Sequence, residues 1–73
     1  MSFRALIELN GEHWVAAVQR PDEEAGWCSL WLDRYDTLRA AQEAAEEKAK
    51  YLQLKPYCQW SAVEGGMVRI YSE

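Results

Sequence analysis

One stretch of the chain, residues 36–55, carries a sustained helical period of apolar positions. Apolar residues recur there at steps of three or four, which places their side chains along one stripe of a helix. The stripe consists of Leu38, Ala41, Ala45, Ala49 and Leu52. The opposite side, expected to face water, carries Glu43, Glu46, Glu47 and Lys50. The alanines favour the helix and let it approach closely to the surface that it covers.

The ends of this helix are predicted from the residues that flank it. Asp36 or Thr37 is expected to cap the first turn, because both side chains accept hydrogen bonds from free backbone N–H groups. Pro56 disfavours helical geometry at Lys55, so the helix must end by Leu54.

The N-terminal part alternates apolar and polar residues and predicts a hairpin of residues 3–9 and 12–20. Asn10-Gly11 favours a two-residue type I′ turn, which would pair Leu9 with Glu12 and Ile7 with Trp14. One face of this hairpin carries Phe3, Ala5, Ile7, Trp14, Ala16 and Val18. The other face carries Arg4, Leu6, Glu8, His13, Val15 and Ala17. Both faces are more apolar than a fully solvated face would be.

A third strand is predicted from Trp27 to Asp33 or Tyr35, after a polar loop at residues 21–26. Pro21 is expected to end the second strand and Gly26 to close the turn. Strict alternation places Cys28, Leu30 and Leu32 on one side of the third strand. It places Trp27, Ser29 and Trp31 on the other side.

The C-terminal residues 57–72 predict a second hairpin around Gly65-Gly66. Its register would place Val63 opposite Val68 and Ser61 opposite Ile70. We expect Val63, Val68 and Ile70 to face the core. The residues expected on the other side are Trp60, Ala62, Met67, Arg69 and Tyr71. In an alternative interpretation, residues 57–60 form a loop and only the last strand is regular.

The predicted order is β-β-β-α-β-β, an α+β fold in which one helix packs on one face of a single antiparallel sheet of four to five strands. Residues 1–73 form one domain on this interpretation. One helix covers one face of the sheet, yet the sequence places aromatic residues on both faces. The open face is expected to present Trp27, Trp31, Trp60, Met67 and Tyr71. Such a patch predicts an interface, because monomers rarely expose one so large. Alternatively, the sheet curls and these residues form an ordinary core.

Composition narrows the classes of function. An apolar fraction of 49% argues against disorder. The net charge of −4 opposes binding to nucleic acid phosphates and is compatible with a basic protein surface as partner. No apolar run approaches the ~20 residues that a membrane span needs, and no signal peptide pattern is found. We therefore expect a cytoplasmic protein that has no membrane or nucleic acid partner.

Two acidic clusters are candidate partner contacts. They are Asp22, Glu23 and Glu24 in the polar loop, and Glu43, Glu46 and Glu47 on the helix. Both clusters could simply be solvated. Alternatively, their carboxylates could bind a basic groove, such as one in a nucleic-acid-binding complex.

Catalytic and metal-binding patterns are weak in this sequence. Cys28 and Cys58 lack the spacing of a redox or zinc site and are expected to be reduced thiols, although neighbouring strands would allow a bond between them. His13 is the only histidine, and no oxyanion-forming glycine motif or phosphate loop accompanies it. We therefore expect a protein that is not an enzyme and holds no cofactor or metal.

Two phrases of the sequence, GEHWVAAV and GWCSLWLDRYDTLRAAQEAAEE, carry a resemblance to a class of known proteins. In size, acidity and composition the chain resembles small accessory proteins of phages and mobile elements, of the anti-CRISPR inhibitor type. The likeness covers about half of the chain and assigns no role to any residue. It implies an inhibitor or adaptor that occludes a host protein in the bacterial cytoplasm.

Together these features predict a non-enzymatic protein-binding module, for which self-association as a homodimer is a further expectation. Its partner-binding candidates are Trp27, Trp31, Trp60, Tyr71 and the two acidic clusters. The alternative is a binder of small molecules or single-stranded nucleic acid that uses the aromatic rings as a stacking platform.

Overall fold

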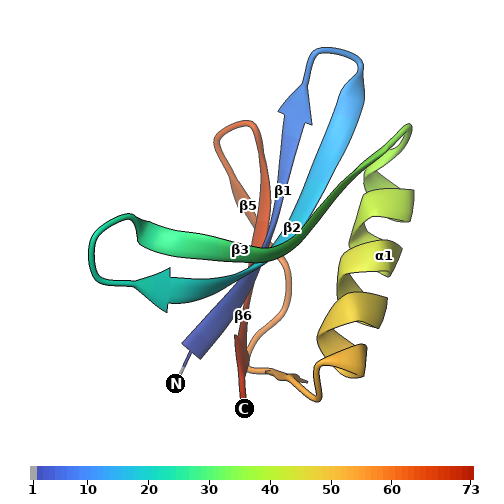
Figure 1. Cartoon of the computed structure of the whole chain (residues 1–73). Coiled ribbons are helices and arrows are strands. Elements are labelled where there is room, and N and C mark those ends of the chain that lie inside the picture. Colours follow the sequence, from blue (N-terminus) through green and yellow to red (C-terminus); the bar gives the residue numbers. More distant parts are fainter. Residues whose placement is uncertain (1) are drawn as a thin grey trace.

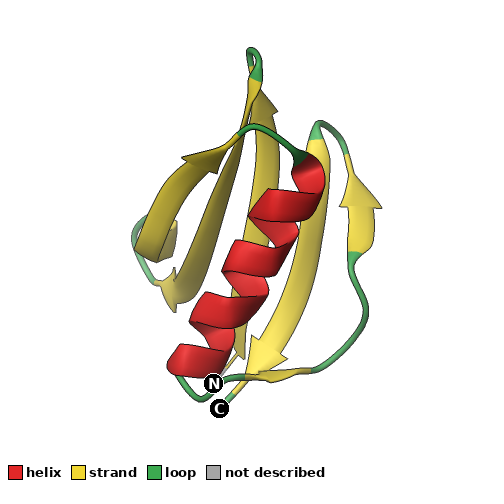
Figure 2. Ribbon diagram, turned by 90° about the vertical axis from the view of Figure 1, so that its right-hand side faces the viewer, coloured by secondary structure: helices red, strands yellow, loops and turns green. Residues whose placement is uncertain are grey.

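A computed structural model describes residues 2–73 and shows an α+β fold, as the sequence predicts (Figures 1 and 2). One helix lies across one face of a six-stranded antiparallel sheet. The elements in chain order are β1 (Ser2–Asn10), β2 (His13–Asp22), β3 (Gly26–Tyr35), α1 (Leu38–Tyr51), β4 (Lys55–Pro56), β5 (Ser61–Val63) and β6 (Gly66–Ser72). The strand beyond the predicted set is β4, which has only two residues.

The strands lie in the order β3-β2-β1-β6-β4, and β5 also pairs with β6. The chain forms the hairpins β1–β2 and β2–β3 and then crosses the sheet through α1. It returns on the far side of β1, where β6 pairs with β1 along most of its length. The ten-residue strand β3 is therefore left at one edge of the sheet.

The helix begins and ends as its sequence predicts. The Thr37 side chain accepts a hydrogen bond of 3.1 Å from the Ala40 N–H, which identifies Thr37 as the N-cap. At the other end, Gln53 adopts a left-handed conformation (φ 62°). Gln53 and Leu54 donate their N–H groups to the carbonyls of Lys50 and Ala49, both at 2.9 Å. These two bonds form a Schellman motif, which satisfies carbonyls that the end of a helix leaves free.

The predicted stripe of α1 packs on the sheet. Ala41, Ala45 and Ala49 are fully buried, and Leu38 and Leu52 pack against the core at its margin. On the sheet the core includes Phe3 and Ile7 of β1. The remaining buried core residues are Ala5, Ala16, Val18, Leu54 and Tyr71.

The first hairpin forms with a register two residues away from the predicted one. Asn10 pairs with His13 and Leu9 with Trp14, so the turn residues are Gly11 and Glu12. Only Gly11 in this turn has a positive φ (67°), as at the first central position of a type II′ turn. The predicted faces of the hairpin remain correct, because a shift of two residues returns each side chain to the same face.

The C-terminal hairpin differs from the prediction in the same way. Ser61 pairs with Val68 and Val63 with Gly66, so the turn lies at Glu64 and Gly65. Gly66 is already inside β6, where an added Cβ atom would overlap the carbonyl oxygen of Ile7. The close approach of β1 therefore keeps Gly66 in the strand and moves the turn back by one residue.

The prediction of which face of the C-terminal strands is covered was wrong. Because β6 pairs with β1, Tyr71 lies opposite Phe3 and Met67 opposite Ile7, and all four side chains point toward α1. Val68 and Ile70 point away from the helix instead. The pairing partner of β6 decides this face, and the sequence pattern does not specify that partner.

The prediction for β3 was wrong for a different reason. The register between β2 and β3 shifts between Val18 and Gln19, and Leu30 is the extra residue of this bulge. Trp31 therefore points toward α1, whereas Trp27 and Ser29 lie on the far face. In addition, Pro21 does not end β2, which continues to Asp22 and pairs there with Gly26.

Candidate functional site: the open sheet face

The sheet face that points away from α1, named here the open face, is largely aliphatic. Its central row crosses five adjacent strands, as the pairing register shows. The row consists of Leu32 (β3), Ala17 (β2), Leu6 (β1), Val68 (β6) and Ser61 (β5). Five strands about 4.8 Å apart make this row roughly 19 Å wide. A continuous apolar surface thus lies on the side of the sheet that the helix leaves uncovered.

Two further rows flank the central one. On one side lie Arg34, Val15, Glu8, Gly66 and Val63. On the other side lie Ser29, Gln19, Arg4 and Ile70. Leu32 is 59% exposed and Val63 42%, whereas Leu6, Val68 and Ile70 are half-buried by their neighbours. An apolar centre with charged and polar margins is the usual composition of a protein interface.

The row that contains Arg4 is held in place by side-chain contacts. Arg4 donates to Gln19 at 2.7 Å, and Gln19 donates to Ser29 at 3.0 Å. The guanidinium of Arg4 also lies 4.2 Å from the centre of the Trp27 ring, a cation–π contact. Partial burial lowers the pKa of Arg4, and the nearby charge of Glu8 opposes this change. Trp27 and Arg4 together offer an ordered pair of the residue types that are enriched in interface hot spots.

The core beneath the helix receives only small side chains from α1. Its helix side is alanine, and the largest fully buried side chains are Ile7 and Val18. Alanine buries little apolar area, so this core contributes less stabilisation than one of leucines would. The bulk of this core comes from the sheet and from a residue after the helix, through Phe3, Leu54 and Tyr71.

Three of the four predicted aromatic site residues lie on the helix side rather than on the open face. Tyr71 is 3% exposed in the core, and Trp31 and Trp60 are half-buried against it. Trp27 is the one predicted ring that the open face carries. The predicted aromatic open face is therefore corrected to an aliphatic one.

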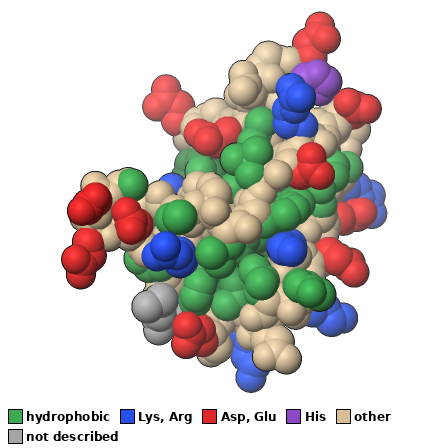
Figure 3. All heavy atoms as spheres, viewed as in Figure 1, with side chains coloured by type: hydrophobic (Ala, Val, Ile, Leu, Met, Phe, Trp, Pro, Cys, Tyr) green, Lys and Arg blue, Asp and Glu red, His purple; other side chains and the backbone are tan. Residues whose placement is uncertain are grey.

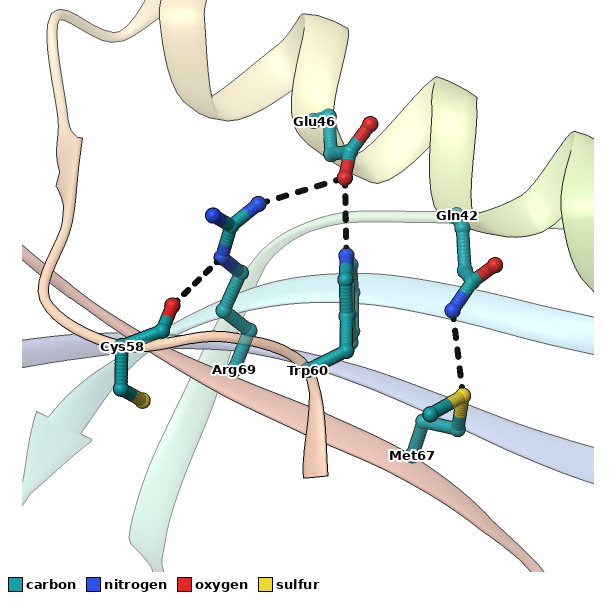
Figure 4. A network of polar contacts seen from close by, with 6 residues as sticks. All are labelled: Gln42, Glu46, Cys58, Trp60, Met67 and Arg69. Carbon is teal, nitrogen blue, oxygen red and sulfur yellow. Dashed lines mark hydrogen bonds and ion pairs between the residues drawn. The ribbon is translucent and has the colours of Figure 1, made fainter. Parts of the chain in front are cut away.

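Trp60 belongs to a polar network that attaches residues 57–60 to the helix (Figure 4). Glu46 Oε2 accepts a hydrogen bond of 2.8 Å from the Trp60 indole and lies 3.2 Å from Nη1 of Arg69. Arg69 Nε also donates to the carbonyl of Cys58 at 2.8 Å. We call Glu46, Cys58, Trp60 and Arg69 the clasp. Glu46, expected to face water, instead joins α1 to β6 and to the segment before β5.

A neighbouring contact links α1 to β6 in the same region. The Gln42 amide lies 3.0 Å from the sulfur of Met67, which is a hydrogen-bonding distance for this weak acceptor (Figure 4). The C-terminal strand is thus connected to the helix by polar contacts as well as by the buried ring of Tyr71.

The two acidic clusters lie on different parts of the molecule. Asp22, Glu23 and Glu24 are at the tip of the β2–β3 hairpin, which projects away from the helix (Figures 1 and 3). Asp22 is part of the turn itself, since its carboxylate accepts the N–H of Ala25 at 2.8 Å. On the helix, Glu43 pairs with Arg39 at 3.2 Å. The structure therefore does not join these carboxylates into one acidic surface.

The groups considered for catalysis or metal binding are scattered. Cys28 and Cys58 are free thiols, so the disulfide left open by the sequence does not form. The ring of His13 approaches Asp36 at 3.6 Å, at the surface. Within residues 2–73, no three His, Cys, Asp or Glu side chains converge as a metal site would require. In the same range, no helix is long and apolar enough to cross a membrane.

Sequence reasoning missed the central row as a site, although its signal was present. Leu6, Val15 and Ala17 share one predicted face of the first hairpin. The alternation of apolar and polar residues does not indicate which face of that hairpin the helix covers. Comparison of the chain with protein-family models, with curated proteins and with solved structures gives no match.

Proposed function

We propose that this protein is a non-enzymatic protein-binding module that docks an apolar surface of a partner protein on its open face. The observation that carries the proposal is the apolar row Leu32–Ala17–Leu6–Val68 on the face away from the helix, in which Leu32 is 59% exposed, Leu6 and Val68 are half-buried and Ala17 is buried. Burial of such a row contributes a transfer free energy of about 25 cal/mol for each Å² of apolar area removed from water, and the entropy lost on association offsets part of it. The ordered Arg4–Trp27 pair adds a polar contact at the margin of the same surface.

One specific form of this proposal is an inhibitor that occludes a host protein. The sequence resemblance to small phage and mobile-element proteins supports that form, as do the chain length of 73 residues and the net charge of −4. The inhibitor form would be established by capture of a partner from a bacterial lysate and by a loss of that partner's activity when this protein binds.

The stacking-platform alternative has less support. A platform needs several rings on one accessible surface, and the open face carries Trp27 alone, already covered by Arg4. The acidic net charge also opposes the phosphate contacts that provide most of the affinity for nucleic acid.

The experiment is affinity capture from a bacterial lysate with the wild type and two matched variants. Leu32→Lys places a charge in the central row, and Leu9→Lys changes an equally accessible leucine (51% exposed) that points to the other side of the sheet. We expect Leu32→Lys to lose the captured protein and Leu9→Lys to retain it, with both variants folded by circular dichroism. Equal capture by the two variants would contradict docking on the open face.

Sedimentation equilibrium run beside the capture tests whether a second copy is the occupant. In that case the mass rises toward a dimer with concentration for the wild type and for Leu9→Lys, and stays monomeric for Leu32→Lys. A dimer that forms equally well in all three proteins would place self-association on another surface.

A further inference from the structure

A groove between β3 and α1 lies on the other layer of the molecule from the open face. It has a volume of ≈ 330 Å³ and is lined by Trp31, Tyr35, Ala44, Glu47, Lys48 and Tyr51. The volume is at the lower end of ligand sites, so it suits one side chain rather than a large cofactor.

Aromatic rings form the walls of this groove. Trp31 and Tyr35 point to the helix side of β3, with ring centres 6.4 Å apart and planes tilted by 43°. Tyr51, in the last turn of α1, is 78% exposed, although a tyrosine ring is large and mostly apolar. Ala44, whose side chain is small, also lines the groove.

Carboxylates lie in and beside the groove. Glu47 is part of its lining, and Asp33 lies between Trp31 and Tyr35 on the same side of β3. Burial raises the pKa of Tyr35, and the negative charge of Asp33 raises it further. The groove also adjoins the C-terminal end of α1, where the helix dipole is negative.

One ring of the groove already has a cation beside it. The ammonium of Lys48 lies 4.8 Å from the centre of the Tyr51 ring. Arginine does the same elsewhere, since Arg4 stacks on Trp27 and Arg69 lies over Tyr71. The lining itself carries one carboxylate, Glu47, and one ammonium, Lys48, and the carboxylate of Asp33 is a second acid beside the lining, on the same side of β3.

We propose that this groove is a second binding site, and that it receives an arginine side chain from the surface of a partner protein. The flat guanidinium stacks between the Trp31–Tyr35 pair and Tyr51, and it donates hydrogen bonds to Glu47. Arginine fits better than lysine because its planar fork matches both an aromatic face and a carboxylate. The proposal goes beyond docking on the open face and does not depend on it.

The test is an NMR titration with short capped peptides, followed at the indole N–H of Trp31. The probe is an alanine pentapeptide with a central arginine, and the matched peptide carries norleucine there. We expect saturable shifts with arginine and about two- to fivefold weaker binding with norleucine, since a cation–π contact at an exposed site contributes about 0.5–1 kcal/mol. Equal affinity for norleucine would overturn the proposal, as would shifts that never saturate.

Variants show which residues bind the probe. We expect Glu47→Gln and Tyr51→Ala each to weaken arginine binding, whereas Glu43→Gln, one turn earlier on the helix, leaves it unchanged. Unchanged affinity in Glu47→Gln would remove the carboxylate from the site. If tetramethylammonium binds as tightly as the arginine peptide, the site selects quaternary ammonium and the arginine assignment is wrong. Leu32→Lys, which disrupts the open face, is expected to bind the peptide normally, so the two proposals fail separately.

Discussion

Tyr71 of β6 lies directly opposite Phe3 of β1, and both side chains are buried beneath α1. This pairing decides the character of both faces of the sheet. It turns Tyr71 and Met67 toward the helix and leaves Val68 and Ile70 on the open face. The opposite parity of β6 would have turned Tyr71 and Met67 outward, where the sequence analysis expects them.

Gly66 is predicted to be the glycine least tolerant of substitution. An alanine Cβ there would overlap the backbone of Ile7, which cannot move without separating β1 from β6. We expect Gly66→Ala to lower the free energy of unfolding by more than about 3 kcal/mol, measured by urea denaturation.

The control is Gly65→Ala in the adjacent turn, where an added Cβ meets open space but the φ of 79° is left-handed. That strain costs about 1–2 kcal/mol. Similar losses in both variants would contradict the close approach of β6 to β1.

The clasp is predicted to stabilise the C-terminal hairpin. Glu46→Ala removes the acceptor of both Trp60 and Arg69, and it leaves the Arg69 side chain, only 14% exposed, without its carboxylate. We expect a loss of about 1–2 kcal/mol in the free energy of unfolding, because Glu46 is itself partly exposed and screened by water.

Glu47→Ala is the control at the next position. Glu47 is also exposed, and its side chain forms no hydrogen bond or ion pair with the described residues 2–73. Its effect should stay within about 0.5 kcal/mol. If Glu46→Ala is equally mild, the contacts of the clasp contribute nothing measurable.

Gln53 is predicted to be a site of stabilisation. Its left-handed conformation is strained for a residue with a Cβ atom, and glycine adopts it freely. Gln53→Gly should raise the free energy of unfolding by up to about 1 kcal/mol. Relief of the left-handed strain stabilises the folded state by about 1–2 kcal/mol, and the greater backbone entropy of glycine in the unfolded chain offsets part of this.

Gln59→Gly is the matched control, because Gln59 has no positive φ and glycine there only adds freedom to the unfolded chain. Thermal melts of the two variants should move in opposite directions. A lower melting temperature for Gln53→Gly would disprove the strain.

Tyr71 predicts a dependence of stability on alkaline pH. Burial raises its pKa above the ordinary value of 10.0, and the charge of Arg69 partly offsets this. In the unfolded chain the phenol ionises at its ordinary pKa, while in the folded protein it stays protonated to higher pH. The folded state therefore binds more protons above about pH 10, and the free energy of unfolding falls as pH rises through this range.

Urea denaturation at several pH values between about 9 and 11 measures this slope. Tyr71→Phe should flatten the slope, whereas Tyr57→Phe, at a ring that is 79% exposed, should leave it unchanged. Equal slopes in wild type and Tyr71→Phe would mean that ionisation of Tyr71 is not linked to folding.

The sequence by itself determined the local elements. A repeat of three and four residues specifies the buried stripe Ala41–Ala45–Ala49, and the capping residues at positions 36 and 37 and Pro56 bound the helix. Alternation likewise specified which side chains of β1 and β2 share a face. These features follow from interactions between residues close in sequence, which do not depend on how the segments pack together.

Only the tertiary structure decided which sheet face the helix covers, and hence the site. The pairing of β6 with β1 is a contact between distant segments, and either parity satisfies the local pattern equally well. The bulge at Leu30 reversed the side of Trp31 relative to Trp27, and the close approach at Gly66 moved the last turn. Because side chains alternate with a period of two, a register change of one residue, as at the bulge, exchanges the two faces of the sheet, whereas the two-residue change at the last turn keeps them.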